Sequence, residues 1–129
     1  MPSAHPTLSP IDSILSALSV LRVPAEPGEY DIHGQIASAL AAAGLEFAHE
    51  YKLGPRCRVD FLVGRVGIEV KKGRPAAAAL HRQLSRYLAF DALDAVVVIT
   101  QKHTPLPERI GGKPVLQISL SRLWGVALP

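Results

Sequence analysis

The chain has few of the residues that build covalent or soft-metal frameworks. Cys57 is the one cysteine among 129 residues, which excludes an internal disulfide and any metal site made of several thiolates. No apolar run approaches the roughly 20 residues that a bilayer-spanning helix needs. The N-terminus lacks a basic start followed by an apolar block, so no secretory signal is expected. These absences predict an intracellular, cytoplasmic protein without a membrane partner.

The remaining composition suits one compact domain. A chain of 129 residues with 48% hydrophobic and 19% charged content can bury a sizeable core. We expect a helical extension and linker over residues 1–28 and a single domain over 29–129. The net charge of the whole chain is only +3, but positive charge is concentrated over residues 52–74. This stretch contains seven basic residues and only two acids, Asp60 and Glu69. This concentration predicts an anionic partner, and nucleic acid is the leading candidate. The alternative is a solvated basic surface without a partner.

The stretch from Arg58 to Lys71 predicts a β-hairpin. Its two apolar-rich halves meet at Gly64-Arg65, a Gly-x pair that favours a tight turn. Folding there places Phe61 opposite Ile68. Because side chains alternate along a strand, one face is expected to be wholly apolar. The residues expected on that face are Val59, Phe61, Val63, Val66, Ile68 and Val70.

The other hairpin face brings two acids together. Asp60 would lie directly opposite Glu69, and such like charges destabilise a strand pair. We therefore expect a cation between them, and hard oxygen ligands suit Mg²⁺ or Mn²⁺ better than Zn²⁺. Such an ion polarises a phosphoryl oxygen and lowers the pKa of a bound water. Lys71, two residues past Glu69, points to the same face and can orient water or neutralise charge on phosphate.

The flanking segments predict helices around a mixed sheet, an α/β (α+β) fold. Ser9-Pro10 is expected to cap a short helix, and a second helix should run from Glu29 to Ala43 and end at Gly44. A third should have Pro75 in its first turn, with Ala76, Ala79, Leu80, Leu84, Tyr87 and Leu88 buried. The other expected segments are an extended stretch over 45–53, a buried strand over 95–100, a loop over 101–114, a strand over 115–120 and a helical turn over 121–128 that packs Trp124.

These residues resemble the PD-(D/E)xK nuclease superfamily, whose pattern is an acid on one strand and acid-x-Lys on the next. The matching residues are Asp60 in Val59-Asp60-Phe61, and Glu69-Val70-Lys71, although Val59 stands where many members have proline. The resemblance covers roughly residues 29–100. It implies a restriction-endonuclease-like, or Holliday-junction-resolvase-like, αβββαβ core.

The resemblance also implies a site. Asp60, Glu69 and the carbonyl of Val70 would hold Mg²⁺ or Mn²⁺, and Asp60, Glu69, Lys71 and Gln83 would be catalytic. Glu29 would be a third acid, although an acid in a first helical turn also serves the helix dipole. Glu50 is another candidate acid, and His33 could reach a ligand, but no histidine pair has metal-binding spacing.

The implied activity is Mg²⁺-dependent endonucleolytic hydrolysis of DNA with low or structure-based sequence specificity. RNA stays open as a substrate, and cutting both strands needs a homodimer or two encounters. Six basic side chains are expected to hold the nucleic-acid backbone: Arg56, Arg58, Lys72, Arg74, Arg82 and Arg86. Two alternatives remain. The two acids could simply pair with Arg58 and Lys71, or the chain could be a non-catalytic nuclease-like module that binds nucleic acid or protein.

Overall fold

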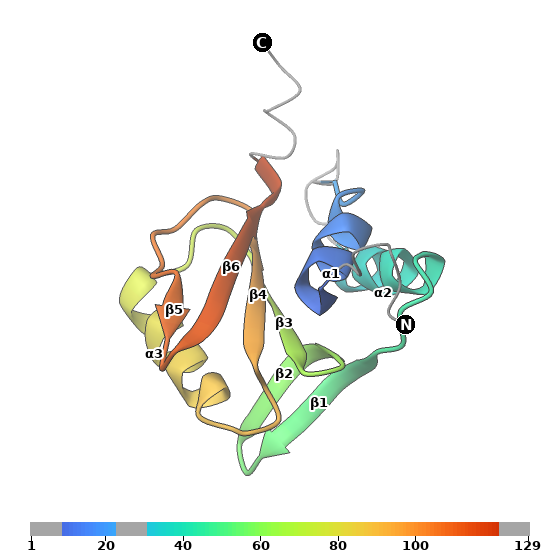
Figure 1. Ribbon diagram of the computed structural model, residues 1–129. Coiled ribbons are helices and arrows are strands. Elements are labelled where there is room, and N and C mark those ends of the chain that lie inside the picture. Colours follow the sequence, from blue (N-terminus) through green and yellow to red (C-terminus); the bar gives the residue numbers. More distant parts are fainter. Residues whose placement is uncertain (1–8, 23–30, 122–129) are drawn as a thin grey trace.

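The computed structural model describes residues 9–22 and 31–121 of the chain (Figure 1). Six strands form one mixed sheet in the order β1-β2-β3-β4-β6-β5. The pairs β1–β2, β2–β3 and β5–β6 are antiparallel, whereas β3–β4 and β4–β6 are parallel. The expected mixed sheet flanked by helices is confirmed. The elements are α1 (Pro10–Leu18), α2 (Ile32–Ala42), β1 (Ala48–Gly54), β2 (Cys57–Val63), β3 (Val66–Lys71), α3 (Ala77–Leu88), β4 (Ala95–Thr100), β5 (Arg109–Ile110) and β6 (Lys113–Ser119).

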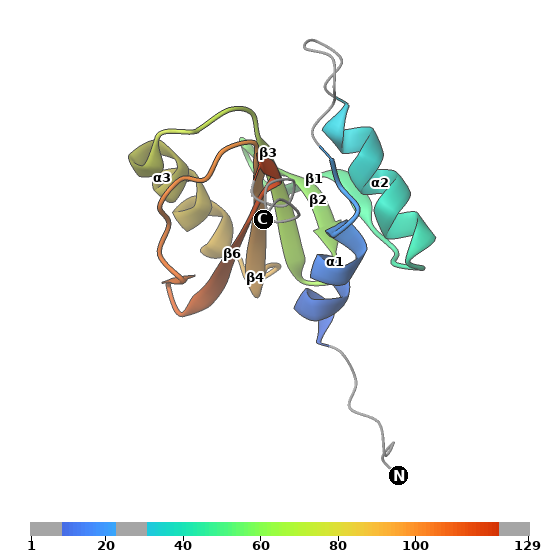
Figure 2. The same ribbon diagram turned by 90° about the horizontal axis from the view of Figure 1, so that it is seen from above.

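Helices cover both faces of the sheet, as Figure 2 shows, with α3 on one side and α1 and α2 on the other. Strand β4 has all of its residues buried, because alternate side chains enter the two cores. Ile14 and Leu18 of α1 belong to the same core as the buried side chains of α2. The α3 core contains Leu80, Leu84, Tyr87, Leu88, Val96 and Val98, among others. Within the two described ranges, no helix is long and apolar enough to cross a membrane.

The first two helices begin at side-chain caps. Ser9 Oγ accepts a hydrogen bond from the Asp12 amide at 3.1 Å, as expected for the Ser-Pro start. The start expected at Glu29 is wrong: α2 begins at Ile32, because Asp31 caps it by accepting from the Gly34 amide at 3.0 Å. Glu29 itself lies outside the described residues.

Helix α3 starts later than expected. Ala76 is its N-cap, so Pro75 precedes the helix instead of occupying the first turn. The cause is a tertiary contact: the Thr104 hydroxyl donates to the Pro75 carbonyl at 3.1 Å and holds this segment extended. Ala76 and Ala79 are exposed, contrary to expectation, whereas the four larger apolar residues predicted for this face are buried.

The segment predicted as a loop over 101–114 contains a small hairpin. Arg109 pairs with Pro114 and Ile110 with Lys113, and Gly111 and Gly112 make the turn with φ of 60° and 79°. Strand β6 therefore begins at Lys113, two residues before the predicted start. The helical turn expected to pack Trp124 lies outside the described residues, apart from Ser121.

The α3 core offers a direct test of the fold. Leu84 is fully buried on α3, so Leu84→Ala is expected to lower the free energy of unfolding by about 2–5 kcal/mol. His81 is exposed on the same helix, and His81→Ala should change it by less than about 0.5 kcal/mol. Urea unfolding of the two variants measures the difference, and equal losses would contradict this packing.

Candidate active site

The β2–β3 hairpin has the predicted register near its turn. Val63 pairs with Val66 and Phe61 with Ile68, around Gly64 with φ of 60°. One expected residue of the apolar face is misplaced: Val59 packs in the α3 core, whereas Phe61 packs in the opposite core. The alternation therefore breaks around Asp60. The neighbouring strand is irregular at the same level, because Glu50 has a φ of 55°.

Asp60 and Glu69 lie where the regular pairing of β2 and β3 ends. Each carboxylate takes a backbone amide of the opposite strand as its donor. The Val70 amide donates to Asp60 Oδ2 at 2.8 Å, and the Asp60 amide donates to Glu69 Oε1 at 3.3 Å. The two acids thus lie between β2 and β3 where the pairing of these strands ends; we call Asp60, Glu69 and their two amide bonds the fork. These bonds offset part of the repulsion expected between the acids.

Glu69 is the more buried of the two acids. It is 4% exposed, whereas the Asp60 side chain is 25% exposed. Burial raises the pKa of Glu69 to about 7, the nearby charge of Asp60 adds to the rise, and Lys71 partly opposes it. Lys71 Nζ lies 3.3 Å from Glu69 Oε2, and the Lys71 side chain is 30% exposed. Lys71 therefore places an ammonium beside the acids, and this ammonium reaches both the Glu69 carboxylate and solvent.

Gln83 of α3 also contacts this pair of acids. Its Nε2 atom donates to Glu69 Oε2 at 3.3 Å and to the Tyr87 hydroxyl oxygen at 2.9 Å. Tyr87 in turn donates to the Arg58 carbonyl at 2.9 Å. Burial, then the charge of Glu69, raises the pKa of Tyr87, which keeps the hydroxyl protonated as a donor. The sequence predicted Tyr87 only as a core residue, because its helical spacing reveals the buried face but not the hydroxyl contact.

Of the other two candidate acids, Glu29 lies outside the described residues and Glu50 lies on β1. Glu50 is exposed, and its Oε1 lies 3.3 Å from Arg58 Nη1. On the α2 side, His33 Nε2 lies 3.9 Å from Asp60 Oδ2. His33 Nδ1 also lies 2.9 Å from His49 Nε2, and the His49 ring stacks on Phe61. The sequence could not place His49 here, because the two histidines are 16 residues apart.

The basic residues divide into separate groups. Arg56, Arg58 and Arg86 line one cavity of about 460 Å³, which also includes Lys52, a residue not predicted as a contact. Arg82 is exposed on α3, and Lys72 and Arg74 are exposed after β3. Arg65 lies at the hairpin turn, where its Nε atom is 2.8 Å from Asp94 Oδ2. Its charge therefore belongs to a structural ion pair.

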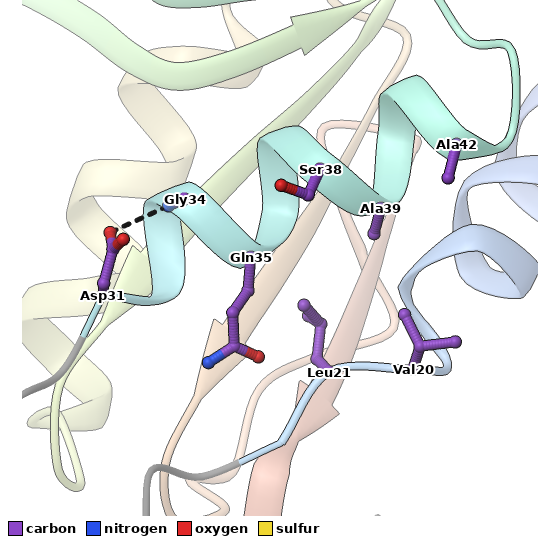
Figure 3. A pocket seen from close by; sticks show the side chains of 8 residues that line it. All are labelled: Val20, Leu21, Asp31, Gly34, Gln35, Ser38, Ala39 and Ala42. Carbon is purple, nitrogen blue, oxygen red and sulfur yellow. Dashed lines mark hydrogen bonds between the residues drawn. The ribbon is translucent and has the colours of Figure 1, made fainter.

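A second cavity, of about 560 Å³, lies between α2 and the segment after α1 (Figure 3). Among the described residues, its lining is mostly apolar or small, with Asp31 as the one carboxylate. That carboxylate already caps α2 through the Gly34 amide. The described residues that line this cavity offer no set of groups for catalysis.

The donor set at the fork fits a hard divalent cation. Asp60 and Glu69 supply carboxylate oxygens, and Mg²⁺ typically takes one or two carboxylates and keeps several waters. No cluster of three or more His, Cys, Asp or Glu side chains able to hold a metal occurs within residues 9–22 and 31–121. The buried negative charge, reflected in the Glu69 pKa of about 7, is an electrostatic reason for a cation to bind here.

Glu69 makes stability depend on pH in chelator-treated protein. Its pKa rises from 4.5 to about 7 on folding, so the unfolded chain ionises first as the pH rises. Between these values the wild type should lose up to about 3 kcal/mol of unfolding free energy relative to Glu69→Gln. Denaturant unfolding at pH 4.5 and pH 7.5 measures this difference. A difference between wild type and Glu69→Gln that does not change with pH would contradict the burial of a charged group.

Comparison with protein-family models, with curated proteins and with solved structures finds no match to this chain, so the arrangement at the fork is the basis on which its function is inferred.

Proposed function

We propose that this protein is a metal-dependent nuclease that hydrolyses DNA phosphodiester bonds. The observation that carries the proposal is the convergence of Asp60, Lys71 and Gln83 on the buried carboxylate of Glu69. The element order from α2 to β4 supports the finer assignment to a restriction-endonuclease-like core. Two acids and a lysine on adjacent strands are suited to hydrolysing a phosphodiester.

Asp60, Glu69 and the carbonyl of Val70 would hold Mg²⁺ or Mn²⁺. When bound, such an ion polarises a phosphoryl oxygen and lowers the pKa of water. Asp60 is bound at one oxygen by the Val70 amide, which fixes its direction in the fork. Glu29 is a further candidate ligand, outside the described residues.

Lys71 is the residue that would act on water or on the reacting phosphate. Its partial exposure and its contact with Glu69 place the ammonium between the acid and solvent. There it orients the attacking water and offsets charge that develops on phosphate. Gln83 and Tyr87 have a positioning role, because their hydrogen bonds hold Glu69 against α3.

Exposed basic residues would hold the nucleic-acid backbone through salt-sensitive phosphate contacts. They lie on the β1–β2 side, after β3 and along α3. Phosphate contacts carry no direct sequence information, so low or structure-based specificity is expected. One fork per chain would cut one strand per encounter, and duplex cleavage would need a homodimer or two encounters.

One observation favours a second candidate, a non-catalytic nucleic-acid-binding module. Both Glu69 oxygens have protein partners: the Asp60 amide on Oε1, and Gln83 and Lys71 on Oε2. A buried acid whose oxygens are hydrogen-bonded within the protein can have a purely structural role.

Lys71→Ala separates the two candidates. For a nuclease, we expect kcat on DNA with Mg²⁺ or Mn²⁺ to fall on the order of 100-fold or more, because the charge beside the reacting phosphate is lost. Gel assays on supercoiled, linear, branched and single-stranded DNA, and on matched RNA, measure cleavage. Lys72→Ala, at the exposed residue directly after β3, is the control and should raise KM more than it lowers kcat.

The contrary result is equally definite. If the wild type binds these substrates but cuts none of them with either metal, and Lys71→Ala keeps the same affinity, the binding module is the correct function. Metal affinity that is unchanged in Asp60→Ala would also count against the metal site.

A further inference from the structure

A cavity of about 460 Å³ lies directly beside the fork. It is lined by Lys52 of β1, by the turn and start of β2, and by α3. The lining residues from the last two regions are Arg56, Cys57, Arg58, Gln83, Arg86 and Tyr87. Burial raises the pKa of the Cys57 thiol, which therefore stays neutral and adds no negative charge. The cavity is thus polar and strongly basic, and none of its lining residues in the described part of the chain is a carboxylate.

Most of this positive charge has no ion-pair partner within residues 9–22 and 31–121. Among the residues that the structure describes, Arg58 pairs with Glu50, whereas the side chains of Lys52, Arg56 and Arg86 make no ion pair. Three cations around one small cavity repel one another, and an anion between them removes that cost. The sequence brings them together from three separate segments.

Arg56 is also held in an unfavourable backbone conformation. Its φ is 58°, in the left-handed region that glycine and asparagine adopt more readily than arginine. Strained residues of this kind concentrate at binding and catalytic sites. Glycine would be more stable than arginine at this position, so we expect the Arg56 side chain to have a function.

The cavity shares a wall with the two acids. Gln83 and Tyr87 line it, and Gln83 donates to Glu69 from the same amide nitrogen that donates to Tyr87. Tyr87 also donates to the carbonyl of Arg58, another lining residue. A group bound in the cavity therefore lies next to the fork, separated by these two side chains.

We infer that this cavity binds the terminal phosphate of a nucleic-acid strand, a phosphomonoester, and so directs cleavage to the neighbourhood of strand ends. The inference rests on the proposed nuclease function. A terminal phosphate carries nearly two negative charges at neutral pH, whereas an internal phosphodiester carries one. Three unpartnered cations match the former better. The volume also lies in the range of pockets that enclose a small ligand, such as the end of a strand.

Binding measured without cleavage tests the inference separately from the catalytic proposal. The wild type in EDTA is titrated, by fluorescence anisotropy, with one duplex carrying either 5′-phosphate, 3′-phosphate or only hydroxyl ends, and with a closed dumbbell of the same sequence. We expect one of the two phosphates to tighten binding by about tenfold or more over the hydroxyl-ended duplex. The arm that responds identifies the strand end.

Arg56→Gly is the decisive variant. It removes the guanidinium and relieves the left-handed strain, so we expect a higher Tm together with loss of the phosphate preference. Arg109→Ala removes one charge at the opposite edge of the sheet and should keep the preference. Equal affinity of wild type for phosphorylated, hydroxyl-ended and closed duplexes would overturn the inference even if the protein cleaves DNA. A phosphate preference that Arg56→Gly abolishes would support it even if no cleavage is found.

Discussion

The structure depends on one costly arrangement, a carboxylate almost completely withdrawn from water beside a second carboxylate. Glu69 is compensated from three directions: by the backbone of β2, by an amide from α3 and by the ammonium two residues along its own strand. None of these contacts removes the cost fully, because the pKa of Glu69 still stands at about 7. A fold selected for stability alone would place an apolar side chain here.

The sheet explains why these groups meet. Strand β3 is the junction between the antiparallel and the parallel halves, so it is paired along both edges. Glu69 and Lys71 are in register with Val98 and Thr100 of β4 and are therefore held on the more firmly supported strand. The parallel connection from β3 to β4 passes through α3, and this crossover brings Gln83 and Tyr87 over the fork.

Much of this could be predicted from the sequence, because strand alternation and helical spacing are local rules. They located the hairpin register, the buried strand β4 and the large apolar residues of α3. Local rules failed where tertiary contacts decide: the Thr104 hydroxyl sets the start of α3, and the irregularity near Glu50 and Asp60 turns Val59 to the other core. Strand alternation predicted that Asp60, Glu69 and Lys71 share one face of the hairpin. It could not predict the backbone amides that donate to the two acids.

Charge was the least predictable property. Seven basic residues between Lys52 and Arg74 predicted an anionic partner but not how these charges are arranged. The structure instead assigns Arg65 to Asp94, and it collects Lys52, Arg56 and Arg58 with Arg86 from a distant helix. Counting charge along a chain detects an excess, but only the fold shows which charges share a space.

The Arg65–Asp94 contact has a mechanical consequence for the hairpin. The guanidinium binds the Asp94 carboxylate, and the Asp94 amide donates to the Arg65 carbonyl at 2.7 Å, so the turn is fastened to the chain just before β4. The turn end of the hairpin is therefore held in place both by its own strand pairs and by the chain before β4. Asp60 and Glu69 lie at the other end, where the regular β2–β3 pairs stop and the two amide–carboxylate bonds connect the strands instead.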